Sequence, residues 1–231
     1  MSTAPSDRAR ARVGRPRDDA IDDAVLAATI VVLDEVGYAR LSLGDVARRA
    51  GTSKPALYRR WPSRQHLVLA ALERRIGSVR PPDTSCTMCD LAECLGLFVE
   101  AFEQLPPGVL APLLADSADD AALRAELMAR LFDPPREAVR RTLSRARERG
   151  DLRAELGLDL AVDLLGSFVH YRALFGHAPT TPEEIETAVE TLLQGLATDY
   201  DSLLAHAQGV EVVAQPHELH AYGGPSQAAS G

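Results

Sequence analysis

The stretch that decides the fold runs from residue 41 to residue 64 and reads LSLGDVARRAGTSKPALYRRWPSR. Two short amphipathic segments, 42–50 and 54–60, flank a turn that contains Gly51. Ser42 suits the N-cap position of the first segment. Two short helices joined by a three- or four-residue turn with glycine are typical of a helix-turn-helix. We therefore predict this motif here, since glycine adopts the positive φ of such a turn at little cost.

Helical patterns extend on both sides of this motif. Apolar residues recur at helical spacing over 18–37, which ends at Gly37, and again over 64–76. From residue 87 onward the spacing predicts helices at 88–105, 109–117, 119–132, 136–149, 158–175 and 182–205, with one kinked element as the alternative for the third and fourth. No segment predicts a strand. The sequence therefore predicts an all-α protein, with an N-terminal helix-turn-helix three-helix domain at 18–80 and a larger helical domain at 84–207.

The net charge of −8 hides an asymmetry between the two halves of the chain. Residues 1–80 hold 15 Arg and Lys against 9 Asp and Glu, whereas residues 81–231 hold 10 against 24. The first half is suited to a polyanion, although chance clustering of solvated charge would look the same. Residues 1–17 are predicted to be a flexible Arg-rich arm, and residues 208–231, rich in Gly, Pro, Ser and Gln, a disordered tail.

The region from about residue 20 to residue 70 resembles the DNA-binding domain of TetR-family regulators. The resemblance is carried by Gly37, by the stretch 41–64 and by Leu67, and its motifs are specific. The region 84–207 is similar to the family only in being helical and in length. The resemblance implies a ligand-responsive transcriptional regulator, a repressor released from a palindromic operator by a small molecule. Its expected partners are double-stranded operator DNA, an unknown small-molecule effector and a second copy of the chain, in the cytoplasm.

The resemblance also implies which side chains contact DNA. Lys54 and Ala56 occupy positions that face base edges in the family, and Tyr58 one whose phenol meets a phosphate. Arg59 can reach a guanine edge through two hydrogen bonds. Phosphate contacts, which position without specifying sequence, are expected from Arg60 and Arg64. Ser42 completes this set. The alternative is a plain solvated face. Gly44 departs from relatives that carry a long polar side chain there, which puts a base contact from that position in doubt.

The Arg-rich arm is a second candidate DNA contact. Residues 14–17 read Gly-Arg-Pro-Arg and resemble the core of a minor-groove AT-hook, with Arg15 and Arg17 as the contacts. Arginine is drawn into narrow A·T minor grooves by their negative potential. A basic leader without a specific role is the alternative.

Aromatic residues of the larger domain suggest an effector pocket. An apolar cavity with a few polar groups is typical of small-molecule sites. The expected ligand-binding residues are Phe98, Phe102, Leu113, Phe132, Phe168, His170, Tyr171 and Phe175. Each aromatic ring taken alone would also suit an ordinary core.

The last two predicted helices suggest a dimer. Segment 158–175 is apolar nearly all round and must be covered on several sides. Two such helices from each subunit would form the four-helix interface that family members use, although both could be core helices of a monomer. The expected interface residues are Leu164, Ile185, Ala188, Val189, Leu192, Gly195 and Leu196.

Other functions find weaker support. Asp18–Asp22 matches the DDxxD pattern of terpene synthases, but acids in a first helical turn are explained by the helix dipole. Cys86 and Cys89 form a CxxC pair with Cys94 nearby, and no further ligands complete a metal site. We expect inert thiols, with a thiol-reactive sensor as the alternative. The sequence therefore predicts no enzyme, metal or cofactor, and an architectural DNA-binding protein is the main rival.

Overall fold

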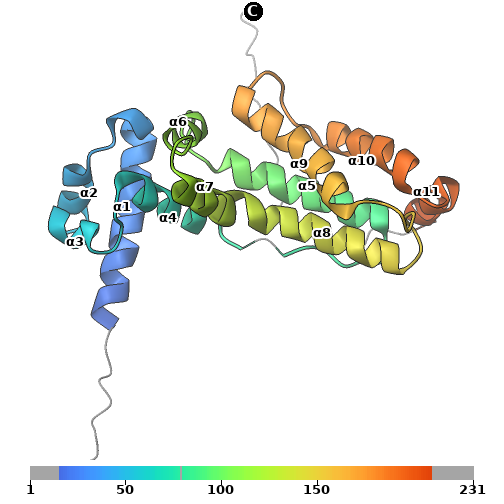
Figure 1. The fold of residues 1–231 in the computed structure, drawn as a ribbon, viewed down its shortest axis with the longest axis horizontal. Coiled ribbons are helices and arrows are strands. Elements are labelled where there is room, and N and C mark those ends of the chain that lie inside the picture. Colours follow the sequence, from blue (N-terminus) through green and yellow to red (C-terminus); the bar gives the residue numbers. More distant parts are fainter. Residues whose placement is uncertain (1–15, 79, 210–231) are drawn as a thin grey trace, which may run out of the picture.

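The computed structural model describes residues 16–78 and 80–209, with side chains from residue 19 onward. Every named element in this part of the chain is helical, as the sequence predicts (Figure 1). The predicted arm and tail lie outside the described residues, except that residues 16–17 already belong to the first helix and 208–209 to the last. None of the helices in the described ranges has the length and hydropathy that a membrane span requires.

Four helices form the N-terminal unit. They are α1 (Pro16–Arg40), α2 (Leu43–Arg49), α3 (Lys54–Tyr58) and α4 (Arg64–Ile76). Apolar side chains from all four meet in one core, among them Val25, Val46, Leu57 and Leu67, which are at most 2% exposed. The predicted stop at Gly37 is real but local: φ is +73° there, and the chain adds one further turn before α1 ends at Arg40.

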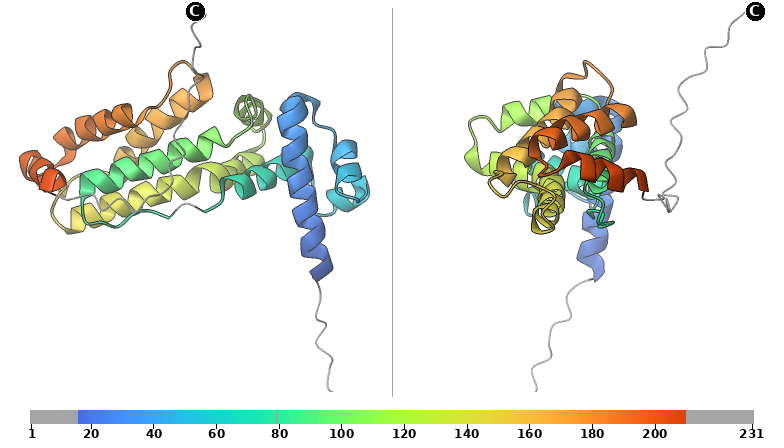
Figure 2. Two further views of the ribbon diagram at one scale, coloured as in Figure 1. Left: turned by 180° about the vertical axis from the view of Figure 1, so that it is seen from behind. Right: turned by 90° about the vertical axis from the view of Figure 1, so that its right-hand side faces the viewer.

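The remaining helices form an elongated bundle. They are α5 (Thr87–Glu103), α6 (Leu110–Asp116), α7 (Ala121–Leu127), the π-helix η1 (Met128–Phe132), α8 (Asp133–Glu148), α9 (Leu158–Phe175), α10 (Pro182–Leu196) and α11 (Tyr200–Gly209). Helix α5 packs against α8, α9 and α10 along its length. Figures 1 and 2 show α1 running across the long direction of this bundle, at one of its ends.

Two boundaries differ in an instructive way from the sequence expectation. The predicted kinked element exists: α7 continues through η1 into α8, and Pro134 and Pro135 lie in the first turn of α8, where a missing N–H costs least. The single helix predicted over 182–205 is wrong. It breaks at Ala197, which is extended and pairs with Leu152, while Asp199 accepts the Ser202 N–H and starts α11.

Helix α4 joins the two units. It packs against α1 on one side and against α7 and η1 on the other. Polar contacts join α4 to both elements: His66 Nε2 lies 3.3 Å from the Glu126 carboxylate of α7, and Glu73 pairs with Arg130 of η1. A displacement of α7 or η1 therefore reaches α4 directly.

Candidate DNA interface and effector core

The turn between α2 and α3 has the geometry that the sequence predicts. The Gly44 N–H donates to Ser42 Oγ at 3.2 Å, so Ser42 caps α2. Gly51 has a φ of +64°, and the Thr52 N–H closes the turn on the Ala47 carbonyl oxygen at 2.9 Å. Leu57, only 2% exposed, anchors α3 on the core beneath it. The short helix α3 is thus anchored on the core with one face outward.

That outward face carries the α3 side chains predicted to contact DNA, together with Arg59 just after the helix. Lys54 and Arg59 are exposed, Tyr58 is 53% exposed, and Ala56 is half-buried. The aliphatic end of Lys54 lies over Gly44, where an added Cβ would approach Lys54 Cε to 2.9 Å. The small residue at position 44 therefore makes room for Lys54, which occupies the space that a long side chain would take.

The arginines predicted to contact phosphates are engaged within the protein. Arg60 pairs with Asp22 of α1. The Arg64 guanidinium lies 4.5 Å from the centre of the Tyr38 ring and 3.5 Å from Asp116 Oδ2. Of the arm residues, Arg15 lies outside the described residues, and Arg17 is in the first turn of α1 with its side chain outside them.

Asp116, at the end of α6, gathers three side chains of the N-terminal unit. Tyr38 donates its hydroxyl hydrogen to Asp116 Oδ2 at 2.5 Å, Gln65 Nε2 donates at 2.9 Å, and Arg64 lies beside both. These hydrogen bonds, that from Tyr38 first, lower the pKa of Asp116. Burial and the Asp116 bond raise the pKa of Tyr38 to about 12. Sequence reasoning missed this cluster, because nothing local relates residues 78 positions apart.

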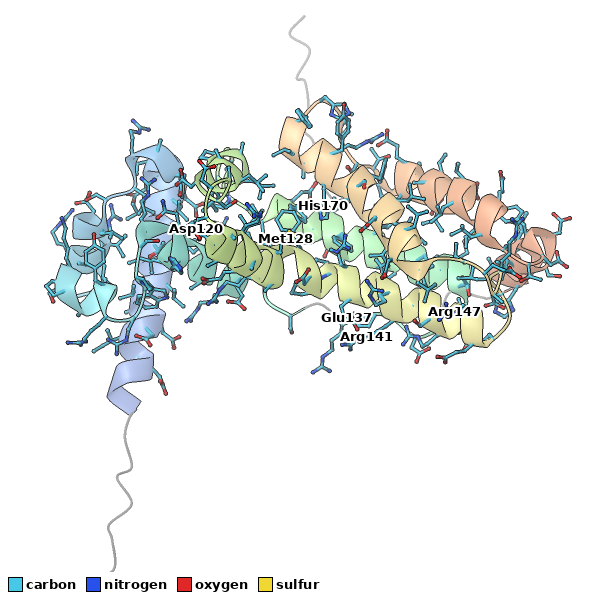
Figure 3. All side chains as sticks on the ribbon, in the orientation of Figure 1. Asp120, Met128, Glu137, Arg141, Arg147 and His170 are labelled. Carbon is cyan, nitrogen blue, oxygen red and sulfur yellow. A yellow bond between two sulfur atoms is a disulfide. The ribbon has the colours of Figure 1, made fainter. Side chains whose placement is uncertain are left out.

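Part of the predicted effector site forms one aromatic cluster. The His170 ring lies 5.8, 5.0 and 4.9 Å from the rings of Phe98, Phe102 and Phe132, measured between centroids. The three phenylalanines come from α5 and η1, and His170 comes from α9. Figure 3 labels His170 among the side chains of the bundle. Leu113 is buried in the same core, whereas Phe168 lies under the Arg172 guanidinium.

His170 is unusual within this cluster. Burial, followed by the charge of Arg136, lowers the pKa of His170 to about 4, so the ring is neutral at ordinary pH. Within the described residues, its buried Nε2 has no hydrogen-bond partner. A buried polar atom without a partner costs on the order of 1–3 kcal/mol. A ligand that hydrogen-bonds to Nε2 would recover that energy.

Two predicted ligand-binding residues lie elsewhere. Tyr171 and Phe175 are 57% and 65% exposed and stand on the outer face of α9, so their assignment to the core pocket is wrong. They share that face with Leu160 and Leu164, which are 63% and 52% exposed. These four residues, the α9 stripe, recur at helical spacing. The sequence could not separate this stripe from the core face, because both sides of α9 are apolar.

The predicted dimer residues divide by burial. Leu164 and Gly195 are exposed, and Ala188, Leu192 and Leu196 are half-buried. Ile185 and Val189 are 7% and 0% exposed, so they face the core and cannot offer surface to a partner, contrary to the prediction. A separate shallow depression of about 480 Å³ contains none of the predicted residues and is lined by Ala129, Asp133, Pro134, Arg136, Glu137 and Arg140.

A rigid helix-turn-helix on a helical bundle defines a DNA-binding transcription regulator. Comparison of the sequence with known protein families gives the same class of protein. Residues 25–71 match "Bacterial regulatory proteins, tetR family", and residues 81–192 match "Tetracyclin repressor-like, C-terminal domain". The chain belongs to the TetR family of transcriptional regulators, which is not a family of enzymes.

Individual relatives extend this comparison. The chain is 31% identical over 170 residues to the HTH-type transcriptional regulator Mb1581 of Mycobacterium bovis, covering 73% of this chain and 84% of that protein. It is 33% identical over 113 residues to the "DNA-binding transcriptional repressor TetR" of Mycobacteroides abscessus, covering 48% of this chain and 60% of that one. The crystal structure of the TetR family transcription regulator SCO0332 superposes with a TM-score of 0.60 at 30% identity, covering 76% of this chain and 97% of the other.

Proposed function

We propose that this protein is a dimeric transcriptional repressor that releases a palindromic operator when a small molecule binds its bundle. The observation that carries the DNA part is α3: Leu57 anchors it, while Lys54, Tyr58 and Arg59 remain exposed side by side. The M. abscessus relative, named a repressor, supports the direction of control. Such a protein acts where the chromosome is, in the cytoplasm.

Binding to DNA is tested by matched charge removals. Arg59→Ala should weaken operator binding and relax the preference at one base pair, by about 1–3 kcal/mol. Arg141→Ala removes the same charge from the outer side of α8, where Figure 3 shows the side chain pointing away from the bundle. The Arg141→Ala variant should bind the operator with unchanged affinity. For the wild-type protein, the logarithm of operator affinity should fall with the logarithm of salt concentration, by about 0.9 for each phosphate contacted. Equal effects of the two substitutions would refute base reading by Arg59.

The effector is proposed to occupy the aromatic cluster around His170. Three phenyl rings favour a flat apolar group, and the neutral imidazole offers a hydrogen bond without a charge. The cluster lies on η1 and α5, and η1 packs on α4. A molecule inserted there would press on η1 and displace α4, which follows the helix-turn-helix in the chain and packs against α1.

A pair of small probes tests this site. Phenol and toluene are similar in size, but only phenol can hydrogen-bond to Nε2. Phenol should raise the midpoint temperature of unfolding more than toluene, because only phenol satisfies the buried nitrogen. The difference should vanish in His170→Phe. If phenol and toluene behave alike in the wild type, the polar contact is refuted. If neither probe stabilises the protein, an architectural DNA-binding role without an effector is favoured.

A further inference from the structure

The segment that leads into α5, residues 80–86, is held against the bundle by polar contacts. Figures 1 and 2 show residues 80–86 running along the bundle to the start of α5, at the end remote from α1. Arg145 of α8 holds it midway, through the Pro82 carbonyl oxygen and the Asp83 carboxylate, the latter at 3.2 Å. We call residues 80–86 the strap. In the sequence the strap follows α4 (Arg64–Ile76) by a few residues, so the chain connects it to the DNA-binding unit.

The strap ends in a disulfide bond between Cys86 and Cys89. The sequence predicts inert thiols at these two positions, and the structure pairs them instead. Cys86 is the N-cap of α5, and its sulfur accepts the Cys89 N–H at 3.2 Å. The bond therefore closes the first turn of α5 covalently.

Polar contacts bind the strap to this closed turn. Thr84 donates its N–H and its hydroxyl hydrogen to Asp90 Oδ1, at 3.0 and 2.7 Å, and Asp90 is 1% exposed. The Cys86 N–H in turn donates to Thr84 Oγ1 at 3.2 Å. The disulfide, the buried carboxylate and the end of the strap thus form one unit, so a change at the sulfur atoms reaches the strap.

From this arrangement we propose that Cys86 and Cys89 form a reversible thiol–disulfide exchange site for low-molecular-weight thiols and disulfides, and that its redox state sets operator affinity through the strap. A thiolate of the incoming reductant attacks Cys89 Sγ, the less buried sulfur, since Cys86 is 1% exposed. The Cys86–Cys89 bond breaks, and Cys86 leaves as a thiolate at the N-terminus of α5, where first-turn N–H groups stabilise negative charge.

A second thiol completes the reaction. Its thiolate attacks the sulfur that the first thiol contributed to the mixed disulfide, the bond from that sulfur to Cys89 Sγ breaks, and Cys89 leaves as a thiolate. The two cysteine thiolates take up the two protons of the small thiols, so that the protein disulfide and two thiols become a protein dithiol and one small-molecule disulfide. Cys94 takes no part: it is buried against Thr142, and burial raises the pKa of its thiol to about 11. Cys94 therefore gives one thiol in both the oxidised and the reduced protein, against which the change at Cys86 and Cys89 can be counted.

The exchange itself is tested without DNA. The full-length protein is equilibrated in buffers of reduced and oxidised glutathione, quenched with acid, then denatured and alkylated. Mass spectrometry should count one reactive thiol in the oxidised protein and three in the reduced protein, reversibly. In the native reduced protein, iodoacetamide should label Cys89 before Cys86. A pair that stays reduced in oxidised glutathione, or stays oxidised in reduced glutathione, would overturn the exchange site.

The regulatory part rests on the proposed function as a DNA-binding regulator, and it has a separate readout. We expect reduction to weaken operator binding by at least roughly fivefold, the low end of ordinary coupling between sites, because a loosened strap holds α4 less rigidly. The double variant Cys86→Ser/Cys89→Ser keeps a good N-cap and should bind equally in both buffers. Exchange without a change in wild-type affinity would overturn the regulation alone. Absence of any operator binding, with exchange intact, would instead refute the proposed function.

Discussion

At the scale of single residues, His170 shows how the surroundings decide chemistry. The sequence predicts it in the effector site, because imidazole is a polar group among aromatic neighbours. Only the structure shows that three phenyl rings pack around it and that its Nε2 atom is buried without a partner among the described residues. Spacing along a helix can place a residue on a face, but burial depends on what the other helices bring to that face. Tyr171, its neighbour in sequence, is exposed because it lies on the other side of α9, away from these rings.

The lowered pKa of His170 predicts a pH dependence of stability. Its ordinary value of 6.5 applies to the unfolded chain, and the folded value is about 4. Between these values the unfolded state binds a proton that the folded state does not, so stability is lost as pH falls. The free energy of unfolding should drop by roughly 2 kcal/mol between about pH 7 and about pH 5 because of this residue.

Denaturant unfolding at both pH values measures this effect. The His170→Phe variant is the control, since it fills the same space without titrating. It should lack this part of the pH dependence while retaining whatever the carboxylates contribute. Identical pH slopes for the two proteins would show that the ring is not held neutral in the folded state.

At the scale of elements, amphipathic patterns predicted most helices but not how they break or pair. Helix α9 was predicted from residue 158 to residue 175, as found. The break after α10 depends on a bridge between Leu152 and Ala197, which lie in distant parts of the sequence, and no local pattern signals it. The aromatic pair on the outer face of α9 was assigned to the pocket because a helix with two apolar sides does not reveal which side meets the core.

The α9 stripe leads to a prediction about assembly. Large apolar side chains exposed in one row on a helix mark an interaction site, and a second copy of α9 would cover them. Leu164→Glu should therefore convert the proposed dimer into a monomer and weaken operator binding, because one helix-turn-helix reads only a half-site. Sedimentation or light scattering measures the mass.

The matched control is Val31→Glu. Val31 is 44% exposed on α1, so it tests an apolar-to-acidic change on a surface outside the stripe. The mass of this variant should equal that of the wild type. A dimer that survives Leu164→Glu unchanged would place the interface elsewhere.

At the scale of the whole molecule, the basic and acidic halves of the chain meet at α4. The sequence showed the asymmetry of charge but not where the halves touch. In the structure the contact is specific: Asp116 of the acidic unit faces Arg64, which we propose as a phosphate contact. The same guanidinium therefore has two alternative partners, the carboxylate of the bundle and the backbone of DNA. Competition between them would link the state of the bundle to operator binding.

The substitution Asp116→Asn tests this competition. The amide oxygen of the new side chain can still accept a hydrogen bond from Tyr38, but it no longer attracts the Arg64 guanidinium, so less energy is needed to present Arg64 to a phosphate. An exposed ion pair contributes about 0.2–1 kcal/mol, and we therefore expect operator affinity to rise by up to roughly fivefold. Asp119→Asn makes the same change of charge at another exposed acid, three residues further along the chain. Fluorescence anisotropy with labelled operator compares the two variants. An equal gain from both would mean that only net charge matters. A gain in affinity from Asp116→Asn that persists when Arg64 is also replaced by alanine would show that the carboxylate acts through something other than Arg64. If the gain disappears in this double variant, the acidic bundle is linked to DNA through the one guanidinium that both can bind.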